Sequence, residues 1–183
     1  MIKHILFIII VLLVNNSFCQ PVYKTKNGTA SFVSNAPLEI IRAESAEVQG
    51  AIDPGKKTFA FSIDNKSFKG FNSPLQQEHF YENYLEVQSF PASTFKGKII
   101  EDIDLNSSLE QTVRAKGMLN IHGVEQERII KGTIRVVDGK ISLKADFSVM
   151  LEDHQIRIPR VVNQKIAESI DVSVTAELVK SND

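Results

Sequence analysis

The stretch KISLKADFSVML, residues 140–151, decides the fold of this chain. Its apolar residues fall on every second position from Ile141 to Leu151, and the positions between them from Lys140 to Ser148 are charged or Ser. A period of two places all the apolar side chains on one face of an extended strand. The stretch is therefore predicted to form a β-strand with one buried face and one solvated face.

The same alternation recurs along most of the chain, and turn-forming residues separate the segments. Further strands are predicted at residues 38–52, 57–65, 92–102, 112–122, 125–137 and 170–179. Asp53-Pro54-Gly55 and Asp138-Gly139 are typical turns, and Asn27-Gly28 predicts a first hairpin between residues 22–26 and 29–34. About eight strands at hairpin spacing indicate an all-β fold, a single extended antiparallel barrel, because closure removes the exposed sheet edges.

One short helix is expected near residues 74–84. Ser73 is a good N-cap, Pro74 suits the first helical position, and Gln76 can complete a capping box. Four residues at roughly helical spacing are expected to face inward and to cover one end of the sheet. They are Leu75, His79, Phe80 and Tyr84.

The first 19 residues have the features of a secretory signal peptide, which leaves residues 20–183 as one domain. Lys3 precedes an apolar run over residues 5–14, which is too short to span a membrane, since a spanning helix needs about 20 residues. Cleavage is expected after Cys19, and the exported chain is expected in the periplasm. The alternative is a lipid anchor on Cys19, which the bulky Phe18 disfavours.

Charge and motifs exclude several classes of function. The net charge is −1, so nothing predicts nucleic-acid binding, and no dense Lys/Arg cluster marks an anionic membrane surface. His79, His122 and His154 have no His or Cys at metal-ligand spacing, so no metal site is predicted. No nucleophile motif occurs. We expect no catalytic residue and no cofactor.

The interior face mixes large and small residues. A barrel of about eight strands can be filled by its own side chains or can hold one small ligand, and periodicity leaves both alternatives open. The small inward positions are Ala115, Gly117, Gly132, Ala145 and Ala176.

Two segments, LEVQSFPASTF at residues 85–95 and KGMLNIHGV at residues 116–124, together resemble the YceI-like family. The resemblance extends over about residues 28–178 and implies a lipocalin-like barrel that holds an isoprenoid or similar amphiphilic lipid in its lumen, without catalysis. Burial of the apolar tail would supply the affinity. The lumen candidates are Phe59, Phe61, Ile63, Phe95, Val113, Ala115, Phe147, Val149, Val172 and Val174.

The sequence departs from the family pattern at two places. Residues 28–33 read GTASFV where family members carry a His-Ser-like pair, and His154 replaces a frequent aromatic. The head group of the ligand is therefore left open, as is the choice between a monomer and a homodimer. The alternative function is a solid-cored β-domain that acts as an envelope stress or protein-interaction partner. An enzyme acting on a lipid is least favoured, because no nucleophile–base pair is present.

Overall fold

The alternating stretch forms strand β7 (Lys140–Met150) in the computed structural model, which describes residues 21–181. Ile141 and Val149 are buried, whereas Lys144 and Asp146 are exposed on the opposite face. The predicted strand and its orientation are thus confirmed. The predicted signal peptide lies outside the described residues.

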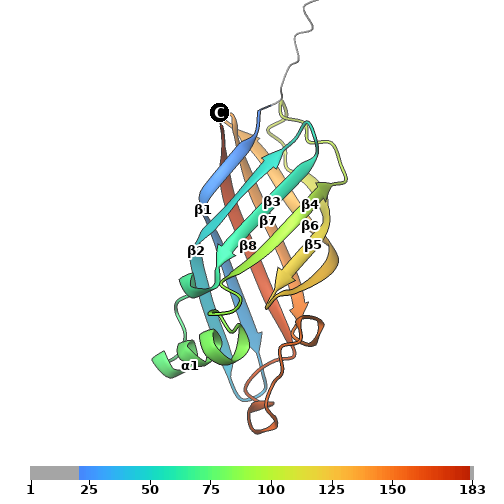
Figure 1. Ribbon diagram of the computed structural model, residues 1–183. Helices are drawn as coiled ribbons and strands as arrows, with labels where there is room; N and C mark the ends of the chain where they lie inside the picture. Colours follow the sequence, from blue (N-terminus) through green and yellow to red (C-terminus); the bar gives the residue numbers. More distant parts are fainter. Residues whose placement is uncertain (1–20, 182–183) are drawn as a thin grey trace, which may run out of the picture.

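Eight antiparallel strands form a closed barrel in which each strand pairs with its neighbours in the chain and β8 pairs with β1 (Figure 1). The predicted all-β barrel is therefore confirmed. No helix within residues 21–181 has the length and apolarity needed to cross a membrane. The other strands are β1 (Tyr23–Asn35), β2 (Ile40–Asp53), β3 (Thr58–Asp64), β4 (Ala92–Ile99), β5 (Gln111–Ile121), β6 (Val124–Val137) and β8 (Ser169–Lys180).

The predicted first hairpin at Asn27-Gly28 is wrong. These residues lie within the continuous strand β1, where the pairing with β2 shifts register on both sides of Gly28. A Cβ atom at Gly28 would lie 3.0 Å from the Cβ of Ala176 and 3.2 Å from that of Val48. Glycine at this position therefore allows the neighbouring strands to approach closely at a bulge.

The predicted helix is present in two parts, α1 (Pro74–His79) and the wider turn η2 (Phe80–Tyr84). The Ser73 side chain accepts a hydrogen bond from the Gln76 backbone N–H, as an N-cap should. The Gln76 side chain does not complete the capping box at Ser73. Its Oε1 accepts a hydrogen bond from the Asn72 backbone N–H instead, and its Nε2 donates a hydrogen bond to Glu39 Oε1.

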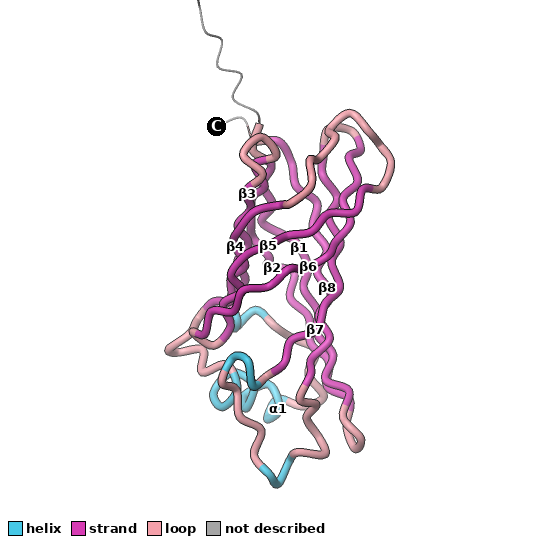
Figure 2. The backbone as a smooth tube through the Cα atoms, turned by 90° about the vertical axis from the view of Figure 1, so that its right-hand side faces the viewer, coloured by secondary structure: helices cyan, strands magenta, loops and turns pink. Residues whose placement is uncertain are grey.

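The two ends of the barrel differ. The end that carries α1 also carries the short helices η1 (Asn65–Ser67), η3 (Glu152–His154) and η4 (Arg160–Val162), and we name it the α1 end (Figure 2). The other end, where β1 begins and β8 ends, we name the far end. The tightest core fills the far half, where Ile52, Ile134, Ile141 and Leu178 are at most 1% exposed.

Candidate lipid-binding cavity

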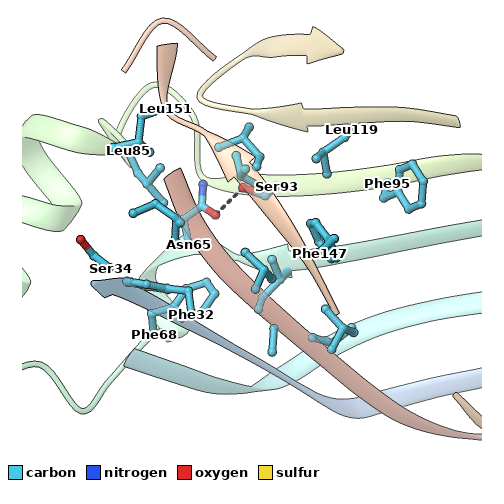
Figure 3. Close-up of a pocket in the computed structure, with 18 of the residues that line it drawn as sticks. Phe32, Ser34, Asn65, Phe68, Leu85, Ser93, Phe95, Leu119, Phe147 and Leu151 are labelled. Carbon is cyan, nitrogen blue, oxygen red and sulfur yellow. Dashed lines mark hydrogen bonds between the residues drawn. The ribbon is translucent and has the colours of Figure 1, made fainter. Parts of the chain in front are cut away.

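A cavity of about 560 Å³ extends from the α1 end into the barrel as far as Ile52, Ile99 and Ile134, which border the far core. All eight strands contribute inward-facing side chains to its wall, and α1, η2 and η4 contribute to its opening. The wall is almost entirely aliphatic and aromatic (Figure 3). A volume of this size is in the range of small-molecule sites.

All ten predicted lumen residues line this cavity, because their strands keep the predicted register. Phe61, Phe95 and Phe147 keep partial exposure although they point inward, because they face the open space and not a packed neighbour. Ala115, Gly132 and Ala145 also line it, whereas Gly117 and Ala176 do not. Contact of these residues with a ligand stays a prediction.

Aromatic rings line the deep part of the cavity beside aliphatic residues of the far core. The ring centroids of Phe59 and Phe95 are 4.8 Å apart, and those of Phe59 and Phe61 are 6.3 Å apart. Phe59 is 5% exposed and packs into the far core with Ile52. The alternative of a solid core therefore holds only for the far half of the barrel.

Few polar groups reach the wall, and most of them are satisfied. Asn65 is fully buried, its Nδ2 donates to the Phe90 carbonyl oxygen at 2.8 Å, and its Oδ1 accepts from Ser93 Oγ at 2.8 Å. Ser34 Oγ accepts from the Ala167 N–H at 2.9 Å. These bonds fasten loops at the α1 end, and they leave the interior without a charged group.

An aromatic cluster holds the helical segment over the opening. The ring of Phe80 stacks on Phe32 at 5.3 Å and contacts Phe68 and Phe71 at 5.8 and 5.0 Å. Phe68 and Phe71 are cavity residues that the sequence analysis missed. The sequence signal for these two residues is their spacing of three positions directly before Ser73, the N-cap of α1. The cluster makes α1 part of the cavity wall.

All four helical residues expected to face inward line the opening, although Leu75 is 59% exposed. Burial raises the pKa of the Tyr84 hydroxyl, which therefore stays neutral. Glu39, His79 and Lys165 are the ionisable groups at the rim besides Tyr84. A ligand would thus meet an apolar interior and a polar opening.

His122 and His154, near the α1 end, have structural roles. His154 is fully buried, and its Nδ1–H donates to the Val124 carbonyl oxygen at 3.1 Å. His122 Nδ1 donates to the His154 carbonyl oxygen at 3.1 Å, and its Nε2 lies 3.1 Å from Glu86 Oε1. Burial lowers the pKa of His154. This chain of contacts joins η3, the β5–β6 turn and the segment after η2.

Several acidic side chains elsewhere lie in surface ion pairs. Glu101 accepts from Arg114 Nε at 2.7 Å, and this bond is the main cause that lowers the pKa of Glu101. Asp102 pairs with Lys57 at 2.6 Å. Among residues 21–181, no group of three His, Cys, Asp or Glu side chains has the arrangement of a metal site.

A family model and several solved structures match this chain. The family model described as the YceI-like domain matches residues 23–178. A polyisoprenoid binding domain from Saccharophagus degradans, implicated in plant cell wall breakdown, has a similar structure, with a TM-score of 0.74 and 13% identity. That match covers 88% of this chain and 99% of the other.

Two further solved structures have the same fold. BcnA from Burkholderia cenocepacia has a TM-score of 0.66 at 14% identity and covers 83% of this chain and 96% of its own. The YCEI protein of Campylobacter jejuni has a TM-score of 0.58 at 17% identity and covers 75% of this chain and 81% of its own. No curated protein sequence matches the chain.

Proposed function

Because the chain belongs to the YceI-like family, we propose that it is an exported, non-enzymatic protein that binds an isoprenoid or similar amphiphilic lipid. The observation that carries the proposal is the cavity of about 560 Å³, whose wall is apolar and which opens beside α1. The similarity to a polyisoprenoid binding domain supports this ligand class. The tail would lie in the cavity, and the head group would stay at the rim.

The volume limits the length of tail that can be enclosed. At roughly 30 Å³ for a water-sized group, the cavity holds on the order of twenty carbon-sized groups, or about four isoprene units. Burial of such a chain at about 25 cal/mol per Å² supplies affinity without directional contacts. A longer chain would extend out of the opening beside α1.

The rim suits a polar head group. Glu39, His79 and Lys165 surround the opening, whereas the wall below them carries no charged side chain. A charged head group would lose its hydration inside the barrel, at a cost of several kcal/mol. The ligand would therefore enter tail first, and the rim residues would contact its head.

The proposed location follows from the leader at residues 1–19, with cleavage after Cys19 and release into the periplasm. A binding protein there would carry a water-insoluble lipid between membranes or enzymes. We assign no catalytic step to any residue, since the cavity holds no nucleophile–base pair among the described residues.

Native mass spectrometry of protein purified from its own envelope tests the proposal. We expect a bound lipid in the wild type and its loss in Phe147→Asp, because this change places a carboxylate in the apolar cavity. Ser142→Asp places the same group on the outer face of β7 and should leave the lipid bound. Repeated recovery of empty wild-type protein, with no thermal shift on adding isoprenoids, would contradict the proposal.

A further inference from the structure

The tip of the connection between β7 and β8 is basic, and the acidic residues of this connection lie at its two ends, Glu152 and Asp153 before the tip and Glu168 after it. Residues 155–167 contain three cations and no acidic residue, although the whole chain has a net charge of −1. The cations are Arg157, Arg160 and Lys165, too widely spaced to form a dense basic run in the sequence. The fold gathers them around the short helix η4.

The tip of this connection is apolar and projects from the molecule. Val161 in η4 is 90% exposed, more than any other large apolar residue of the described chain. Figures 1 and 2 show η4 as the outermost point of the α1 end, further from the barrel than α1. A flat surface that approached this end would therefore meet Val161 first.

The three cations are free to bind a partner. Arg157, Arg160 and Lys165 are exposed, and their side chains form no ion pair or hydrogen bond within residues 21–181. Other basic residues of the barrel, such as Arg114 and Lys57, are held by carboxylates.

The same connection is part of the cavity opening. Val162 and Lys165 line the cavity, one and four residues from Val161. The Gln164 carbonyl oxygen accepts from the N–H of Leu38, another apolar residue, which is 66% exposed. Leu75 on α1, 59% exposed, also lines the opening. Exposed apolar side chains thus lie at or beside the opening.

We propose that the tip of the β7–β8 connection docks the opening of the barrel on an anionic lipid surface. Val161 and Leu38 would enter the headgroup region, and the three cations would bind lipid phosphates, as amphipathic membrane-surface segments do. Charge complementarity selects this occupant over a neutral surface. The inference goes beyond the proposed function, because the docking contacts do not depend on the lipid in the cavity.

The far end supplies a matched control. Leu109 is 73% exposed, and it lies in the loop between β4 and β5, whose charged residues are all acidic. Two of these acids are paired with Arg114 and Lys57, and no cation lies in the loop itself. Exposure of an apolar side chain alone would make Leu109 and Val161 equivalent. If docking needs both nearby cations and an apolar contact, Val161 contributes to membrane binding and Leu109 does not.

Co-sedimentation of the purified protein with lipid vesicles tests the docking. The vesicles are phosphatidylcholine alone or phosphatidylcholine mixed with phosphatidylglycerol, at low and high salt. We expect binding to the anionic vesicles that weakens with salt, about fivefold weaker binding for Arg160→Gln, and at least about tenfold weaker binding for Val161→Asp. Leu109→Asp should bind as the wild type does.

Three outcomes would overturn the inference. They are equal binding to both kinds of vesicle, equal binding of Val161→Asp and wild type, and loss of self-association by the tip variants without any vesicle binding, which would make the tip a contact between two copies. Native mass spectrometry of the same variants keeps the two proposals separate. Vesicle binding by protein that never holds a lipid would support docking and contradict the carrier function.

Discussion

The rings of Phe59 and Phe95 lie on neighbouring strands with their centroids 4.8 Å apart and their planes at 50°, where the cavity meets the solid half of the barrel. Phe59 belongs to the far core, and Phe95 packs against it from the cavity side. Because Ile52 and Ile99 also line the cavity, this pair narrows its deep part, into which the end of a hydrocarbon tail would reach.

Phe95→Ala is expected to enlarge the deep part of the cavity and to shift binding toward longer isoprenoid alcohols. Removal of the ring also costs about 3 kcal/mol in the free energy of unfolding, because the site does not fully collapse. Native mass spectrometry with a series of chain lengths and urea unfolding measure the two effects. Phe32→Ala, which widens the opening only, should leave the preferred length unchanged.

Gly97 and Gly117 face each other across β4 and β5. A Cβ atom at Gly117 would lie 2.2 Å from the Lys96 carbonyl oxygen, so Gly117→Ala forces two strands apart. We expect a loss of about 1 to 3 kcal/mol in the free energy of unfolding. Denaturant unfolding measures it, with Gly139→Asn as the control, because Gly139 has open space around it and Asn tolerates its positive φ.

The sequence predicted the barrel well because strands that are half solvated keep a strict period of two. β7 differs from its predicted bounds by one residue at its C-terminal end and β8 by one residue at each end, and their inward faces form part of the cavity wall as expected. Asn27-Gly28 misled the prediction because a dipeptide suited to a turn also suits a bulge. The choice between them depends on strand pairing, which is a long-range property.

The opening of the cavity was predicted less completely than its wall. Ser73 and Pro74 predict the start of α1, because they suit the N-cap and the first helical position, and the structure confirms this start. Phe68, Phe71 and the β7–β8 connection follow no periodic pattern, so only the closed barrel brings them to one rim. Open volume itself depends on how side chains of the whole barrel meet, which alternation along one strand does not determine.

Tyr81 fastens the helical segment to the barrel. Its hydroxyl donates to the Phe68 carbonyl oxygen at 2.7 Å and accepts from Gln77 Nε2 at 2.8 Å. Tyr81→Phe should cost about 1 kcal/mol locally and raise the frequency of opening about fivefold. Hydrogen exchange at residues 74–84 and the rate of lipid release measure this. Tyr23→Phe, in the far core, should change neither the exchange rate nor the release rate. If Tyr81→Phe has the same two rates as the wild type, Tyr81 does not fasten the segment.

His154 makes the α1 end sensitive to acid. Its ring is fully buried, its Nε2 has no hydrogen-bond partner within residues 21–181, and its pKa is lowered mainly by burial. The ionisable groups around this region include Asp153, Arg128, His122 and Glu86. Protonation would place an uncompensated charge among buried groups.

The sign of the effect follows from linkage. The unfolded chain binds a proton at His154 near pH 6.5, and the folded chain does so only at lower pH, so stability is lost as the pH falls below about 6.5, by up to about 1.4 kcal/mol per pH unit. His154→Phe keeps the aromatic volume and should flatten this dependence, although loss of the bond to Val124 lowers stability near neutrality. Denaturant unfolding at a series of pH values measures both. Two results would assign the acid sensitivity to other groups. One is a pH dependence of the free energy of unfolding in His154→Phe that is as steep as in the wild type. The other is an equal change of this dependence in the exposed control His79→Gln.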